Sequence, residues 1–203
     1  MRAGETASDK NADPIALYDR AMDNLCFIRE TMERAVASTA VSGIGLVAAG
    51  VVACIAAPMA AAQSARRAWL GVWLIAAAVA ASVAAATMWR KARRLRTSLL
   101  SKPGRKLLLN LSPPIFAGAL LTCELARRGD FDVLPAMWML LYGAGVITGG
   151  AFSVRLVPTM GACFMVAGAF GLLFPAWQNV LLAISFGGLH LVFGALISKN
   201  HGG

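Results

Sequence analysis

The sequence predicts an all-α protein, a six-helix transmembrane bundle preceded by a cytoplasmic amphipathic helix. The 203-residue chain is 58% apolar and only 14% charged, whereas about a quarter of the residues in a soluble domain are charged. The apolar residues gather in runs close to the roughly 20 residues that a helix needs to cross a bilayer. Residues 90–106, between two of these runs, hold eight Lys/Arg and no acid.

The polar N-terminal segment comes before the apolar runs. Residues 1–13 lack periodicity and are expected to form a disordered tail. An amphipathic helix is predicted over 14–36, with Asp13 as its N-cap and Pro14 at its first position. Its apolar stripe needs a partner, and its acidic opposite face favours a protein over anionic lipid. No signal peptide is visible, so the first apolar segment is expected to act as an uncleaved insertion signal.

Six apolar segments are expected to cross the membrane. Their approximate limits are 39–61, 68–89, 107–126, 133–152, 157–175 and 178–198, with a short tail over 200–203. Tryptophans near several segment ends are typical of interfacial residues. Glycines recur at intervals near four in the first, fourth and sixth segments. Such glycines favour close helix packing, and the sharper alternative is a substrate groove lined by backbone.

The distribution of positive charge predicts the orientation. Positively charged loops stay in the cytoplasm, so the 90–106 loop places both termini there. About twelve Lys/Arg then lie inside, near the membrane, against four outside. A basic loop at a membrane surface also explains the net charge of +9, and no nucleic acid partner is expected.

A faint internal repeat has an offset of 44 residues. It aligns Pro114 with Pro158 and Tyr142-Gly143 with Phe186-Gly187, among other pairs. Each unit would be one helical hairpin, and the two hairpins would be parallel repeats. Coincidence among small residues is the alternative explanation.

No catalytic signature is present, and no enzyme or cofactor is predicted. His190 is the one histidine inside a predicted segment, and Cys163 lies at a similar depth. Imidazole and thiolate both bind metals, but two ligands are too few for a site. The alternative for His190 is a neutral side chain bonded to a carbonyl or hydroxyl on a neighbouring helix.

Four residues of the third segment are further candidates for a functional role. Pro113 and Pro114 remove two amide donors and free carbonyls such as that of Asn110. A break of this kind lines a site in some transporters, but more often kinks a helix. Glu124 lies three and four residues before two arginines, so a local ion pair competes with proton coupling as its role.

The basic loop is predicted to contact anionic lipid headgroups or a protein partner. The residues that would make this contact are Arg90, Lys91, Arg93, Arg94, Arg96, Lys102, Arg105 and Lys106. The first 34 residues carry seven of the ten acids, so the loop and the N-terminal helix are also expected to dock electrostatically.

Several stretches resemble a family of uncharacterised bacterial multi-pass inner-membrane proteins of about 200 residues. They include Ile28–Arg34, Gly149–Arg155, Val157–Gly161 and Phe186–His190. The resemblance covers most of the chain and implies a location in the bacterial inner membrane, but no activity or substrate.

The leading functional hypothesis is a non-enzymatic membrane component or regulator. It would engage a partner, or a second copy of itself, through the N-terminal helix and the basic loop. The alternative is a small transporter with a polar path near Pro113, Pro114, Glu124 and His190.

Overall fold

The computed structural model describes residues 20, 22–28, 41–94, 102–151 and 153–201. The chain divides into two units, Met1–Ser38 and Thr39–Gly203. In the first unit, residues 20 and 22–28 are helical, and Met22, Leu25 and Ile28 are exposed. The rest of the predicted amphipathic helix and of the tail lies outside the described residues.

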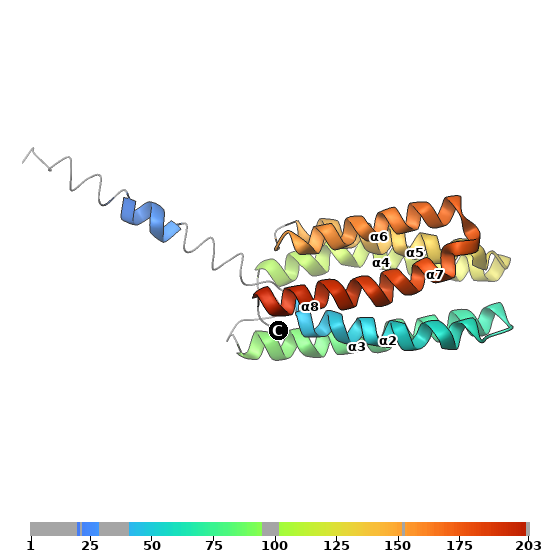
Figure 1. Ribbon diagram of the computed structural model, residues 1–203. Coiled ribbons are helices and arrows are strands. Elements are labelled where there is room, and N and C mark those ends of the chain that lie inside the picture. Colours follow the sequence, from blue (N-terminus) through green and yellow to red (C-terminus); the bar gives the residue numbers. More distant parts are fainter. Residues whose placement is uncertain (1–19, 21, 29–40, 95–101, 152, 202–203) are drawn as a thin grey trace, which may run out of the picture. The chain divides into compact units, whose positions relative to one another are not determined.

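The second unit is a bundle of helices that lie side by side (Figure 1). Six of them are long and apolar enough to cross a membrane, which confirms the all-α transmembrane fold. The first four are α2 (Gly43–Ala61), α3 (Arg66–Arg94), α4 (Lys102–Arg128) and α5 (Leu134–Gly150), with the 3-10 turn η1 (Phe131–Val133) before α5. The fifth is α6 (Leu156–Leu173). The described part of the bundle contains no strand.

The sixth crossing is not one uniform helix. It consists of η2 (Pro175–Trp177), α7 (Gln178–Ala183), the π-helix η3 (Ile184–Leu189) and α8 (His190–His201). A π-helix has one more residue per turn than an α-helix and is often found at functional sites. The sequence predicts the crossing but not this wider segment.

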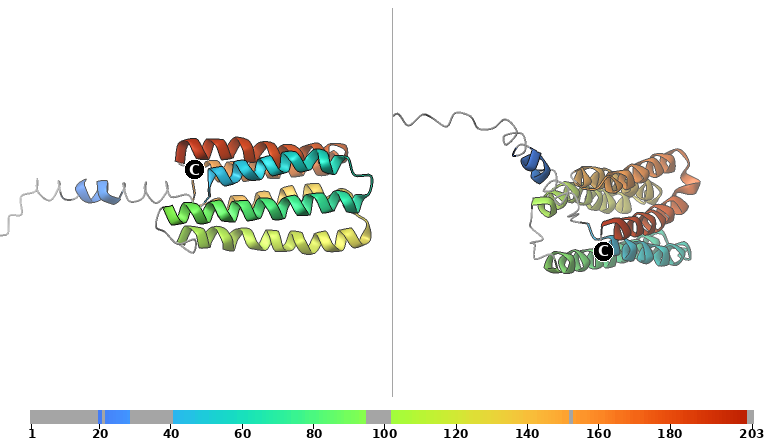
Figure 2. Two further views of the ribbon diagram at one scale, coloured as in Figure 1. Left: turned by 90° about the horizontal axis from the view of Figure 1, so that it is seen from below. Right: turned by 60° about the vertical axis from the view of Figure 1, so that its left-hand side comes forward.

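Helices α3 and α4 extend into the predicted basic loop. Residues 90–94 complete α3 and residues 102–106 begin α4, so only 95–101 lie outside the described residues. Lys and Arg favour helix, and the Arg93 guanidinium stacks over the Trp89 ring at 4.3 Å. We call this the basic end of the bundle, and α8 also ends there (Figure 2). The end that holds Glu124, Asp130 and Asp132 is the acidic end.

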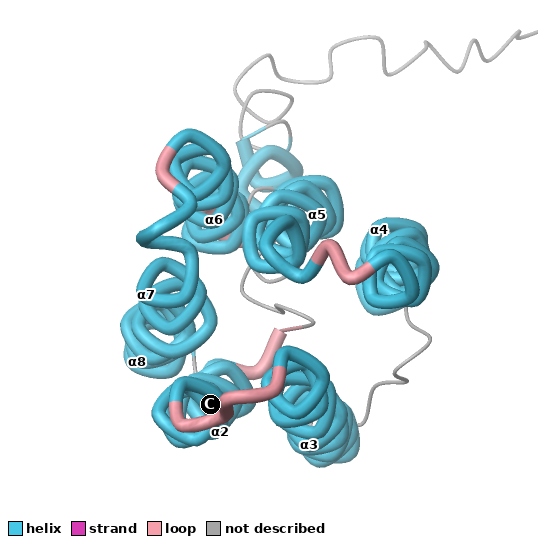
Figure 3. Tube along the Cα trace, turned by 90° about the vertical axis from the view of Figure 1, so that its right-hand side faces the viewer, coloured by secondary structure: helices cyan, strands magenta, loops and turns pink. Residues whose placement is uncertain are grey.

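The helices form two layers of three (Figure 3). In one layer α2 packs between α3 and α8, and in the other α5 packs between α4 and α6. Side chains fill the space between the layers. The main core cluster includes Met139 of α5, Phe164 of α6 and Ile197 of α8, with Trp73 of α3 packed against it.

The helix pairing does not follow the proposed 44-residue repeat. Parallel hairpin repeats would pair α4 with α5 and α6 with α8 in the same way. The structure packs α4 closely on α5, whereas α6 makes its main contact with α5 and α8 makes its main contact with α2. The alignment of Tyr142 with Phe186 nevertheless joins two rings that touch, with centroids 5.2 Å apart.

Candidate functional site

A partly buried hydrogen bond joins the two layers near the middle of the bundle. Tyr142, halfway along α5, and His190, at the start of α8, are linked by a 2.7 Å bond between the phenol Oη and Nε2. His190 is only 4% exposed. The prediction that His190 bonds to a hydroxyl on a neighbouring helix is therefore confirmed.

Aromatic rings enclose this pair. The rings of Tyr142, Phe164 and Phe186 have centroids 4.9 to 5.2 Å apart, and the imidazole lies 5.4 to 6.0 Å from each of them. These are distances of direct contact between rings. The rings leave no space for a ligand between them, so the cluster is not an aromatic cage. We call this packed contact of Tyr142, Phe164, Phe186 and His190 the joint.

The π-helix η3 sets the position of His190 and leaves polar atoms beside it. Ser185 is fully buried, and its hydroxyl has no hydrogen-bond partner. The Nδ1 atom of His190 also has no partner with good geometry, although the backbone carbonyls of Ser185 and Phe186 lie close to the imidazole. A proton on Nδ1 would face these carbonyls and leave Nε2 to accept from the Tyr142 hydroxyl.

Cys163 does not join this cluster. Its neighbour Phe164 is the residue of α6 that contacts the imidazole, and Cys163 itself is half-buried. Among the described residues, no three His, Cys, Asp or Glu side chains come together in a way that would hold a metal ion.

The candidate residues of α4 lie elsewhere. Glu124 is near the acidic end, with its carboxylate 2.7 Å from Arg128 Nε and 3.9 Å from Arg127. Asn110 donates to the Lys106 carbonyl one turn earlier. The hydrogen bond and ring contacts of His190 are with residues of α5, α6 and η3, so the structure does not assemble the polar path proposed from the sequence.

The two prolines do not break α4. The helix runs without interruption from Lys102 to Arg128 through Pro113 and Pro114. Pro114 packs against α5, where it would lie 3.3 Å from a Cβ placed on Gly145. The expected interruption is therefore absent, and Pro114 has a packing role.

The basic end presents its charges on the surface. The side chains of Arg90, Arg93, Arg94 and Arg105 are exposed, and so is that of Lys106. Lys91 instead donates to the Val41 carbonyl at 3.3 Å and ties α3 to the residues before α2. Of the other predicted contacts, Arg96 lies outside the described residues, and for Lys102 only the helical backbone is described.

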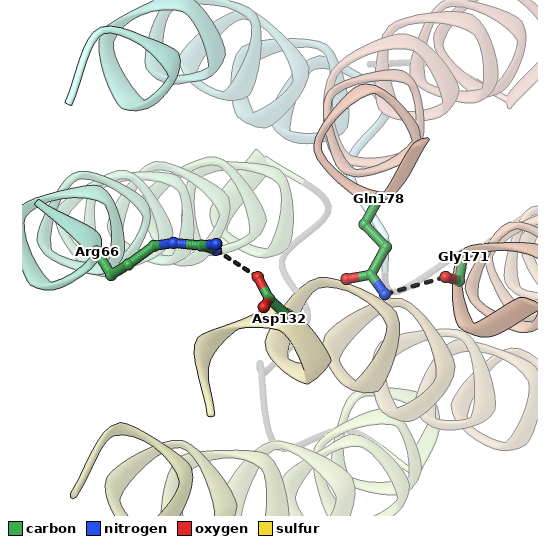
Figure 4. Close-up of polar contacts among 4 residues, drawn as sticks. All are labelled: Arg66, Asp132, Gly171 and Gln178. Carbon is green, nitrogen blue, oxygen red and sulfur yellow. Dashed lines mark hydrogen bonds and ion pairs between the residues drawn. The ribbon is translucent and has the colours of Figure 1, made fainter. Parts of the chain in front are cut away.

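The acidic end closes with local polar contacts (Figure 4). Arg66 of α3 forms an exposed ion pair with Asp132 of η1. Gln178, at the start of α7, is buried and donates to the Gly171 carbonyl of α6 at 3.0 Å. These contacts hold together the connections between helices at this end. The carboxylates of the ion pairs do not face into the bundle.

Sequence reasoning did not predict the partners of His190. Tyr142 is the one tyrosine inside a membrane-spanning segment and was a usable signal, because a buried phenol hydroxyl normally needs a hydrogen-bond partner. Ser185 and the two phenylalanines gave no such signal, since their roles depend on the π-helix and on the pairing of helices.

Comparisons with protein-family models, with curated proteins and with solved structures find no match for this chain.

Proposed function

We propose that this protein is a non-enzymatic component of the bacterial inner membrane that uses its basic end to engage an acidic protein partner in the cytoplasm. The observation that carries the proposal is the separation of charge between the two ends of the bundle. It supports the orientation with both termini in the cytoplasm, because positively charged loops stay on that side.

At the acidic end, two of the three carboxylates pair with neighbouring cations. Glu124 pairs with Arg127 and Arg128, and Asp132 pairs with Arg66. At the basic end, the chain carries no Asp or Glu between residues 34 and 123. The exposed arginines of α3 and α4 are therefore available to carboxylates from outside the bundle. Arginine binds carboxylates through two parallel hydrogen bonds, which gives such a contact specificity.

The N-terminal segment is the second element of the proposal. It carries seven acids in 34 residues, and Met22 and Leu25 are exposed apolar side chains. An exposed apolar stripe on a helix fits the groove of a partner protein.

The transporter alternative has less support. It needs a polar path, but His190 lies among packed aromatic rings, and Glu124 pairs locally at the acidic end. The Pro113–Pro114 stretch lies within a continuous helix. The docking proposal relies instead on the charged surface that the bundle exposes at its basic end.

Cross-linking of the intact protein in membranes, followed by mass spectrometry, tests the proposal. Neutralising the basic end (R90Q/R93Q/R94Q/R105Q) or deleting residues 1–36 should each remove the same cytoplasmic partner. The matched control, R67Q/R127Q, removes exposed charges at the acidic end and should leave the partner list unchanged. If the basic-end variant keeps its partners and loses only co-purified anionic phospholipid, the basic end binds lipid, and the protein-docking proposal is wrong.

A further inference from the structure

The two layers are related by an inversion of helix order. The first half of the bundle comprises α2, α3 and α4, and the second comprises α5, α6 and the sixth crossing. In each half the first helix is the centre of a layer and the second helix flanks it. The third helix belongs to the other layer, so α8 flanks α2 and α4 flanks α5.

The two central helices run in opposite directions. Helix α2 begins at the basic end, and α5 begins at the acidic end, after η1. The packing therefore has the form of an inverted-topology repeat with exchanged third helices. In membrane proteins built this way, two bodies commonly move against each other around a point near the bilayer midplane.

Within each layer one pair of helices touches backbone to backbone, α2 with α8 and α5 with α6, and the third helix packs on that pair mainly through side chains. A Cβ on Gly43 of α2 would lie 2.5 Å from the Ser198 amide nitrogen of α8. A Cβ on Gly143 of α5 would lie 2.7 Å from the Gly161 carbonyl of α6. Such contacts leave almost no room for the helices of a layer to slide or separate, so each layer is a rigid body.

The described polar contacts between the layers lie at two levels. Near mid-bundle is the partly buried Tyr142–His190 hydrogen bond, and at the acidic end are the exposed ion pair Arg66–Asp132 and the buried hydrogen bond from Gln178 of α7 to the Gly171 carbonyl of α6. The chain passes from layer to layer at two places, between α3 and α4 at the basic end and between α6 and α8 at the acidic end.

The π-helix lies where movement between the layers would be absorbed. It directly precedes His190, and Ser185 within it has a buried hydroxyl without a partner. A buried polar group without a partner costs free energy and calls for an explanation. Among the described residues Trp73 Nε1 and Ser153 Oγ are also buried without a partner, but neither lies in the π-helix beside the hydrogen bond that joins the layers.

We propose that the two layers move as rigid bodies and that the Tyr142–His190 hydrogen bond is the latch that holds them closed. This inference is independent of the proposed partner, because it rests on the contacts inside the bundle.

Pulsed electron paramagnetic resonance on the full chain tests the latch. The four native cysteines are first replaced by serine, and spin labels are attached at introduced cysteines. One label pair, at Arg67 of α3 and Arg127 of α4, reports the distance between layers. The other, at Arg127 and Leu173 of α6, reports a distance within one layer. All three positions are exposed.

The test variant is Y142F, which removes the hydroxyl and keeps the ring. Its matched control is T122V, which removes the 3.0 Å hydrogen bond between Trp138 Nε1 and Thr122 Oγ1 inside one layer. The Y142F change should raise the population of the longer inter-layer distance about threefold, the effect expected for one interhelical hydrogen bond in a membrane. The within-layer distances should stay the same.

Three results would overturn the proposal. One is an inter-layer distribution that Y142F leaves unchanged. Another is broadening of both label pairs in Y142F, which would indicate general loosening of the bundle. The last is an equal inter-layer shift in T122V, which would show that any buried hydrogen bond has the same effect.

Discussion

At the scale of single residues, the glycines between paired helices set how closely the backbones approach. We predict that Gly143→Ala will lower stability by about 1–3 kcal/mol, the usual cost of extra volume in a packed interior, because its Cβ would meet the Gly161 carbonyl. Gly71→Ala is the matched control, since no atom lies within 4 Å of its Cβ position. Thermal unfolding in detergent measures both, and equal midpoints would show that the close contact does not matter.

The ion pair at the acidic end should matter far less. Arg66 and Asp132 are 61% and 73% exposed, and exposed ion pairs contribute about 1 kcal/mol or less because water and salt screen them. We expect Arg66→Ala to leave the unfolding midpoint nearly unchanged. A large drop in the unfolding midpoint would mean that this ion pair, and not the buried core, holds the layers together.

Residue roles were predictable where chemistry alone constrained them. The sequence shows that glycines at helical spacing favour packing, and the contacts of Gly43 and Gly143 confirm this. It also shows that Glu124 can pair with the arginines that follow it, and it does. Tyr142 was missed as the partner of His190, because a pair 48 residues apart depends on which helices meet.

At the scale of elements, the π-helix accommodates one extra residue in the sixth crossing. Deleting Gly188 should convert η3 to regular α-helix and leave the parts of the crossing on either side in nearly the same rotation, because the wider π-helical turn holds the residue that is removed. The Tyr142–His190 bond and the contacts before it are then kept. The expected loss of stability is below the roughly 1 kcal/mol of one hydrogen bond, with little change in helix content by circular dichroism.

A deletion in an exposed turn is the control for this change. Gln63 lies between α2 and α3 and is exposed, so its removal should be tolerated. If the Gly188 deletion is far more harmful than the deletion of Gln63, His190 depends on the wider turn itself for its position.

The lengths of the elements were predicted better than their local form. Apolar runs gave the six crossings, because the bilayer requires a minimum length. The sequence also led us to expect an interruption at Pro113–Pro114, and α4 continues through it. Membrane helices accommodate proline when local adjustments and neighbouring groups satisfy the freed carbonyls, and those groups cannot be identified from one segment alone.

At the scale of the whole molecule, the separation of charge predicts a single orientation. In a cysteine-free background, a cysteine at Gln63 should react with a membrane-impermeant maleimide added to the periplasmic side. A cysteine at Arg94 should react only after the membrane is opened, because positively charged loops stay in the cytoplasm. Labelling of position 94 from the periplasm would reverse the topology and contradict the proposed function.

The sequence did not predict which helices pack against each other. In a soluble helix the apolar stripe marks the face that packs, but lipid is as apolar as the bundle interior. The apolar residues of α2 and α6 therefore do not distinguish the face that contacts lipid from the face that contacts another helix. In the sequence, only the spacing of the glycines marks a packing face, and it does not identify the partner helix.

The exchange of third helices has a consequence for biogenesis. Helix α2 is made before the other five crossings, yet Gly43 and Gly50 of α2 pack against the sixth crossing, which is made after them. During synthesis this close-packing face of α2 is exposed to lipid until the four crossings between α2 and the sixth crossing have been inserted. Until α8 is in place, the close-packing face of α2 has no helix partner within the bundle.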